Sequence, residues 1–219
     1  MNLKHLRLAL GALLAAAASL QAQAKIDDAT YAAVVASRPQ IGDVVFIRMG
    51  GPLFATVAST TGSWTSHVGI IVARGKDDWI VAECGIPFVR MTPLRRFLNR
   101  SSEGRFSLRR LTPEPTPEQK AAMLRCANAQ LGRPYSLGFD LEGRGTFCSK
   151  FVHDVVYEST HMNLGQVETF QHLLHSNPNA PLTFWKAWFL GSIPWERTTL
   201  TPASELSSPL LRVVVENNV

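Results

Sequence analysis

Cysteine is scarce in this sequence of 219 residues, which contains three: Cys84, Cys126 and Cys148. A chain that depends on disulfides usually has a denser and even set, so a disulfide scaffold is not expected. In an exported protein, which meets an oxidising environment, a cysteine left over from pairing is a candidate catalytic or reactive thiol. The other two cysteines either pair with each other or lie buried, and the sequence leaves both alternatives open.

Other signals are missing as well. After residue 20 no apolar run approaches the roughly 20 residues that a membrane-spanning helix needs. Basic and aromatic residues are not interleaved, and a formal charge of +5 fits only weak attraction to anionic surfaces. Internal repeats and the glycine patterns of Walker and Rossmann nucleotide sites are absent. We therefore expect no nucleic-acid partner and no cofactor.

The first 24 residues have the order of a secretory signal peptide. Lys4 and Arg7 form a basic start, residues 8–20 are apolar, and Ala22-Gln23-Ala24 is a small-x-small cleavage site. We predict cleavage after Ala24 and a single domain over residues 25–219 in an exported protein, periplasmic or secreted. An uncut membrane anchor is the alternative, but the apolar run is short for a span.

The rest of the chain predicts a mixture of helices and strands. Strands are expected at residues 44–47, 67–73, 79–83, 88–91, 105–111 and 210–215. Helices are expected from residue 27 or 28 to before 39, and at 93–98, 117–131, 148–159, 183–190 and 202–206. Residues 49–62 are rich in glycine and small side chains and predict a loop or lid. This order indicates an α+β fold with an antiparallel sheet.

Cys148 has two interpretations. One is a core residue, because helical spacing relates Cys148, Phe151, Val152, Val155 and Val156. The other is a nucleophile, because Cys148 begins its helix directly after a glycine-rich segment. Unpaired N–H groups and the helix dipole at that position favour an anion and lower a thiol pKa.

His67 and Glu83 are the candidate partners of Cys148. His67 begins an apolar strand, from which its ring can act as the base that takes the thiol proton. Glu83 ends the next strand, where it can orient the imidazole as the third member of a triad. The turn between the strands decides whether Glu83 directly faces His67 or lies about three residues along. The alternative for His67 is a purely structural histidine at the end of the sheet. The alternative for Glu83 is a carboxylate at the rim of the site that pairs with Arg or Lys.

Other polar residues give weaker signals. Ser149 lacks the G-x-S-x-G elbow of a serine nucleophile. His172 and His175 are three apart, but no HExxH or Cys/His spacing accompanies them, so no metal site is predicted. Cys126 shares the apolar face of the helix at 117–131 and is expected in the core.

Several segments resemble the circularly permuted papain-fold hydrolases, the YiiX/YebB-like branch of the NlpC-type peptidase and amidase superfamily. They are IGDVVF from Ile41, SHVGIIV around His67, VAE ending at Glu83, GRPYSLGFD and TFCSKFV around Cys148, and TPASELSSPLL from Thr201. The similarity covers about residues 41–211. In ordinary members the cysteine precedes the histidine, whereas here the order is His, Glu, Cys, as in the permuted branch.

The resemblance implies an antiparallel sheet packed against the helix of the nucleophile Cys148, with His67 as base and Glu83 as third residue. Residues in or beside the motifs are expected to contact substrate: Ser66, Tyr135, Ser149 and Lys150. Lys150 stands where the branch commonly has an acidic residue, which predicts a changed pocket charge. The expected reaction is hydrolysis of an amide bond in cell-wall peptides or amino-acid amides. A lipid-directed acyltransferase or hydrolase and a non-catalytic envelope-binding protein are the alternatives.

Overall fold

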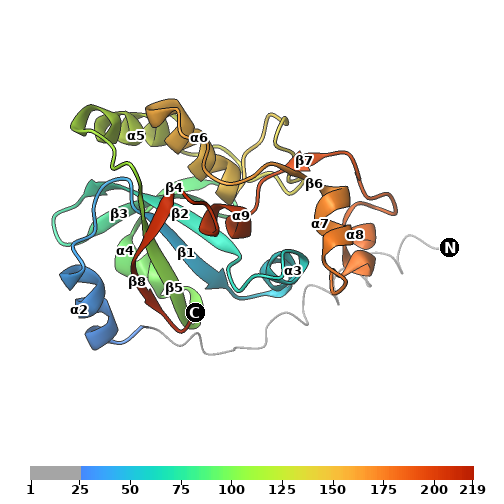
Figure 1. Cartoon of the computed structure of the whole chain (residues 1–219), viewed down its shortest axis with the longest axis horizontal. Helices are drawn as coiled ribbons and strands as arrows, with labels where there is room; N and C mark the ends of the chain where they lie inside the picture. Colours follow the sequence, from blue (N-terminus) through green and yellow to red (C-terminus); the bar gives the residue numbers. More distant parts are fainter. Residues whose placement is uncertain (1–25) are drawn as a thin grey trace, which may run out of the picture.

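The computed structural model describes residues 26–219, in which a six-stranded sheet lies between helices on its two faces (Figure 1). In spatial order its strands are β4 (Val89–Pro93), β3 (Trp79–Cys84), β2 (His67–Arg74), β1 (Val44–Met49), β5 (Ser101–Leu111) and β8 (Leu211–Asn217). All neighbouring strands are antiparallel, which confirms the predicted fold class. The predicted signal peptide lies outside the described residues.

Alternating side chains on the strands build two separate cores, because successive residues of a strand point to opposite faces. Val68 and Ile70 of β2 belong to the core under α5 (Pro117–Ala129) and α6 (Cys148–Thr160). Ile71 belongs to the core on the other face. The helices that cover this second face are α2 (Asp28–Ala36) and α4 (Leu94–Leu98) (Figure 1).

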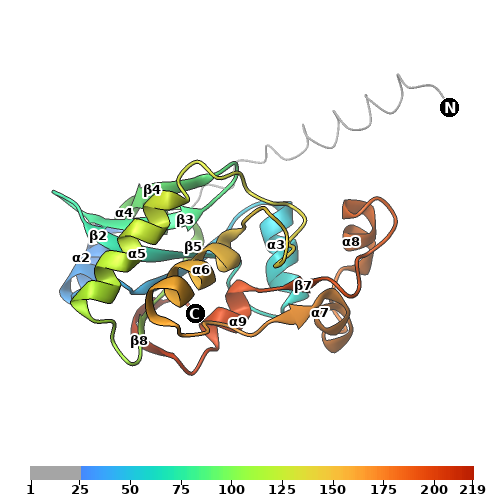
Figure 2. The same cartoon turned by 90° about the horizontal axis from the view of Figure 1, so that it is seen from above.

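The two helices over the first core begin where their local sequence predicts. The side chain of Thr116 accepts from the Gln119 N–H and Gln119 bonds back to the Thr116 N–H, which completes the predicted capping box before α5. The next helix, α6, begins at Cys148 as expected. Figure 2 shows the two helices lying along the sheet. The start of α6 therefore lies close to the strands that carry the other predicted site residues.

The segment predicted as a loop at residues 49–62 is instead largely helical, forming α3 (Pro52–Thr60). Proline suits its first turn, and Gly51 before it has a φ of 96°, which few other residues adopt. Leu53 and Val57 pack against a cluster of aromatic side chains from distant segments. That packing stabilises a helix whose small residues carry little periodic signal of their own.

The aromatic cluster joins α3 to the C-terminal third of the chain. It includes Phe139, Phe147, Phe170 and Trp185, the last two from α7 (Phe170–Ser176) and α8 (Leu182–Trp188). A short ribbon of β6 (Glu168–Thr169) and β7 (Thr198–Thr199) and the helix α9 (Pro202–Leu206) complete the described elements. None of the helices within residues 26–219 has the length and apolarity needed to cross a membrane.

Candidate active site

The thiol of Cys148 lies at the first position of α6 and is 4% exposed. No side chain caps this helix at Phe147, so the backbone groups of the first turn are left for other partners. The backbone N–H groups of Ser149 and Val68 and the Tyr135 hydroxyl lie near the thiol and act to lower its pKa. Since Val68 directly follows His67, the sulfur lies beside the start of β2.

The protonation state of Cys148 differs from the sequence-based expectation. Burial raises the pKa of the thiol to about 12, and the charge of Glu205 acts in the same direction. The helix terminus and Tyr135 lower the pKa, but less than burial raises it. The helix dipole alone therefore does not produce a thiolate, and the resting site holds a neutral thiol that needs a base.

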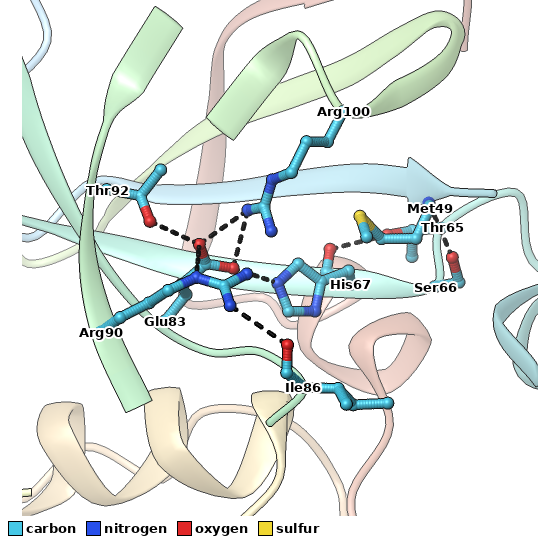
Figure 3. A network of polar contacts seen from close by, with 9 residues as sticks. All are labelled: Met49, Thr65, Ser66, His67, Glu83, Ile86, Arg90, Thr92 and Arg100. Atoms are coloured by element: carbon cyan, nitrogen blue, oxygen red, sulfur yellow. Dashed lines mark hydrogen bonds and ion pairs between the residues drawn. The ribbon is translucent and has the colours of Figure 1, made fainter. Parts of the chain in front are cut away.

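His67 and Glu83 are in direct contact. The Nε2 atom of His67 lies 2.7 Å from Oε2 of Glu83, and the two side chains are 1% and 0% exposed. The carboxylate also accepts from the Thr92 hydroxyl at 2.6 Å, from Arg90 Nε at 3.2 Å and from Arg100 Nη2 at 2.7 Å (Figure 3). Glu83 thus both orients the histidine and pairs with arginine, which combines the two sequence-based interpretations.

A β-bulge brings Glu83 to the same face as His67. Near the turn the hairpin has the tighter of the two registers considered, with Arg74 opposite Trp79. The register shifts by one residue between Ile71 and Ala73. A one-residue shift exchanges the two faces of a strand, so Glu83 comes to lie beside Gly69 instead of Ile70. From there it reaches His67 diagonally.

The electrostatics of the pair favour a neutral imidazole and an ionised carboxylate. Burial lowers the pKa of His67 below 6.5, and the charges of Arg100 and Arg90 add to this, although the bond to Glu83 opposes it. Burial would raise the pKa of Glu83, but His67 and Arg100 more than offset it and the pKa falls below its usual value. Nε2 of His67 therefore carries the proton that Glu83 accepts.

The second nitrogen of the ring does not take part in the contact with Glu83. With Nε2 protonated, Nδ1 of His67 carries a lone pair. Nδ1 has no hydrogen-bond partner among residues 26–219, although it is buried. The ring itself is packed between Phe54 and Phe97, with centroids 6.1 and 5.6 Å away. A fixed imidazole with an available lone pair, one residue from the N–H that lies near the Cys148 thiol, is suited to general base catalysis.

A pocket opens at the thiol, and we call it the thiol pocket. Its apolar lining residues are Val57, Phe139, Phe147, Phe170, Leu173, Trp185, Leu200 and Pro202. Three of the four residues predicted to contact substrate also line it, namely Ser66, Tyr135 and Ser149. Burial raises the pKa of Tyr135 well above its usual value, so its hydroxyl keeps its proton.

Lys150 does not line the thiol pocket. Its ammonium donates to the carbonyl oxygens of Leu141 at 2.5 Å and Gly143 at 2.8 Å. The lysine therefore fastens the glycine-rich segment that precedes α6, and the expectation that it sets the pocket charge is wrong. An i+2 position on a helix points away from the residue at i, which explains the difference.

The other two cysteines remain unpaired. Cys84 lies in the first core, on the strand face opposite to Glu83, and does not line the thiol pocket. Cys126 is partly buried against the same core, close to its expected place.

The structure adds three charged residues that the sequence analysis did not select. Arg90 and Arg100 bind Glu83 from β4 and from the turn between α4 and β5. Glu205 of α9 is 0% exposed, and its carboxyl oxygens have no hydrogen-bond partner within the described part of the chain. Arg90 faces Glu83 across neighbouring strands, a contact that the predicted strand at 88–91 would have suggested had its register been known.

Comparison with known proteins identifies the family. The model of the permuted papain-like amidase enzymes, the YaeF/YiiX or C92 family, matches residues 38–215. The uncharacterized protein YiiX of Escherichia coli K12 is 25% identical over 179 residues, covering 82% of this chain and 87% of YiiX. A crystal structure of YiiX from Escherichia coli O157:H7, described as a metalloprotein, has a TM-score of 0.75 at 26% identity and covers 82% and 98% of the two chains. This chain therefore belongs to the permuted papain-like amidase family of YaeF and YiiX.

Proposed function

We propose that this protein is a cysteine hydrolase that cleaves amide bonds with Cys148 as nucleophile, His67 as base and Glu83 as the anchor of the imidazole. One observation carries the proposal. The thiol at the start of α6 lies near the N–H of Val68, the residue that follows a histidine whose Nε2 is bound to Glu83 and whose Nδ1 has a lone pair available.

The proposed roles define the reaction. Nδ1 of His67 takes the proton of the Cys148 thiol while the sulfur attacks the amide carbonyl carbon and forms a C–S bond. The N–H groups at the start of α6 stabilise the negative oxygen of the tetrahedral intermediate. The intermediate collapses by breaking the C–N bond, and the protonated imidazole gives its proton to the leaving amine. Water, deprotonated by His67, then hydrolyses the thioester and releases a carboxylic acid.

The shape of the site suggests an amide with an apolar acyl side and a polar amine side. The thiol pocket is lined mainly by apolar side chains. It shares Thr60, Thr61, Leu173 and Thr201 with a second, open pocket, the polar groove. The groove is lined by polar side chains that include Arg109, Gln166, Glu168 and Asn177. A peptide or amino-acid amide fits this arrangement when an apolar group enters the thiol pocket and its polar part lies in the groove.

A lipid-directed acyltransferase or hydrolase is the second candidate. The observation that favours it is the aromatic and aliphatic wall of the thiol pocket beside Cys148. The same thioester chemistry transfers an acyl chain to an alcohol, an amine or water. Ester substrates of increasing chain length distinguish this candidate from an amidase.

No step of the proposal passes through a metal ion, although the related YiiX structure is described as that of a metalloprotein. Within residues 26–219 of this chain, no group of three or more His, Cys, Asp and Glu side chains is arranged to hold a metal. The described residues therefore offer no set of ligands from which a metal-dependent step could be written.

The activity is tested by comparing wild type, Cys148→Ala and Cys126→Ala on purified muropeptides, N-acyl amino-acid amides and short acyl esters. We expect Cys148→Ala to lose all measurable turnover and Cys126→Ala to retain it, because Cys126 lies outside the thiol pocket. Mass spectrometry of a quenched reaction should show the acyl group on Cys148. Turnover that survives Cys148→Ala would refute the mechanism, and binding without turnover of any substrate would favour the non-catalytic envelope protein.

We further propose that the protein is exported, which would bring it to substrates of the cell envelope. The support is the basic, apolar and small-residue order of residues 1–24. Fractionation with mass spectrometry of the mature N-terminus tests this proposal. A chain found in the cytoplasm with residues 1–24 intact would contradict it.

A further inference from the structure

The carboxylate of Glu83 is held by more groups than a histidine anchor requires. Arg100 Nη2 lies 2.7 Å from each of its two oxygens, and Arg90 and Thr92 bind Oε1 (Figure 3). Only Oε2 is bound to His67. A carboxylate bonded on both oxygens cannot rotate without breaking several charge-assisted bonds, so the direction in which it faces the imidazole is fixed.

Arg100 and His67 also share a contact with Phe97. The guanidinium of Arg100 lies 5.0 Å from the Phe97 ring centroid, and the same ring stacks with His67 at 5.6 Å and 27°. Gly69 makes the close approach of Phe97 possible, because a Cβ at this position would lie 2.9 Å from the Phe97 ring. Arg100 and His67 thus have two neighbours in common, Glu83 and Phe97.

We infer that Arg100, assisted by Arg90, is a positioning residue for the proposed hydrolysis. It fixes the Glu83 carboxylate so that the carboxylate binds Nε2 of His67 and leaves Nδ1 for the proton of Cys148. The inference rests on the proposed function. The physical reason is that a buried carboxyl tends to take up a proton, and a protonated Glu83 would be a poor acceptor for the imidazole N–H. The bond to His67 and the guanidinium of Arg100 keep the carboxyl ionised, and Arg90 adds a further bond to Oε1.

The charges around the pair give the direction of the expected effect. The charged groups that act on His67 are Glu83, Arg90 and Arg100, from β3, β4 and the turn before β5. Both arginines disfavour a second positive charge on the imidazole. Removing the Arg100 charge should therefore raise the pH at which His67 becomes protonated.

The test combines two measurements on wild type, Arg100→Gln, Arg100→Lys, Arg90→Gln and the surface control Arg212→Gln. Arg212 pairs with Glu114 on the surface. The first measurement is an NMR titration of the His67 imidazole, assigned with His67→Gln, which needs no turnover. The second is the pH profile of kcat/KM. We expect Arg100→Gln to raise the His67 midpoint by about one pH unit and to move the acid limb of kcat/KM equally.

Arg100→Lys separates charge from geometry. A lysine keeps the positive charge but cannot bridge two carboxylate oxygens as a guanidinium does. We expect its His67 midpoint to stay near that of wild type while kcat falls roughly tenfold and KM changes little. If Arg100→Gln does not fold, Arg90→Gln should show a smaller shift in the same direction. A His67 titration in Arg100→Gln or Arg90→Gln that equals that of Arg212→Gln would overturn the inference, whereas a wild type without turnover would refute only the hydrolase.

Discussion

Two glutamates of this protein, Glu83 and Glu205, are equally buried but have opposite environments. Each is 0% exposed. Glu83 accepts hydrogen bonds from four side chains, two of them arginines, and its pKa is lowered. Glu205 has no partner for either oxygen within the described residues, and burial raises its pKa well above 4.5, with the charge of Asp154 adding to the effect.

The comparison shows that burial alone does not decide the charge of a carboxyl group. Burial penalises the anion at both positions, but at Glu83 compensating charges and donors surround it. Glu83 is therefore an anion that can hold the imidazole of His67, and Glu205 is a carboxyl whose ionisation burial disfavours and whose charge, when present, raises the pKa of Cys148. The following predictions test this contrast, beginning with the largest expected effect.

Glu83→Gln should lower kcat/KM by about 10²–10⁴-fold, the usual contribution of a positioned acid–base pair. The amide keeps the size of the side chain but removes the charge that His67 and the arginines face. Kinetics at pH 7 measure the loss, with Glu114→Gln as a surface control. A variant with more than half of the wild-type kcat/KM would show that Glu83 does not support the base.

The two glutamates should affect stability with opposite pH dependence. The folded pKa of Glu83 lies below the ordinary 4.5, so its contribution is present above pH 4.5 and is lost as the pH falls. The folded pKa of Glu205 lies above 4.5, so its contribution is complete below pH 4.5 and is lost as the pH rises toward the folded pKa.

Glu205→Gln should therefore gain stability relative to wild type as the pH rises from 4.5. The expected gain is about 1.4 kcal/mol per pH unit until the folded pKa of Glu205 is reached. Urea denaturation of both proteins between pH 4 and pH 8 measures the difference in the free energy of unfolding. A difference that does not change with pH would mean that Glu205 has a partner in solution that lowers its pKa again.

The smallest expected effect concerns the thiol. Alkylation of Cys148 by iodoacetamide should rise about tenfold per pH unit from pH 7 to pH 10 without a plateau, because its pKa is raised to about 12. In Glu205→Gln the same curve should move slightly to lower pH, because the charge of Glu205 contributes to the raised pKa and burial is the main cause. Peptide mass spectrometry separates Cys148 from the other thiols. A plateau near pH 7 would reveal a resting thiolate–imidazolium pair.

Local features of the site were predictable because they depend on residues within one or two turns of each other. The capping box at Thr116, the helix start at Cys148 and the strand that begins at His67 are such features. The loop predicted at residues 49–62 was wrong because α3 packs on aromatic residues far away in the sequence. Lys150 was misjudged because the helix turns its side chain toward the preceding segment.

The sequence by itself determined the order of most elements, since residue type and periodicity carry that information. It put forward Cys148, His67 and Glu83 as candidates through their places at the ends of elements and through the resemblance to the permuted hydrolases. Only the tertiary structure decided how these residues meet. The bulge after Ile71 brings Glu83 to the face of His67, contacts with His67 and Arg100 keep the carboxylate charged, and burial keeps the Cys148 thiol neutral. Register, burial and charge pairing depend on segments distant in the chain, and no local pattern encodes them.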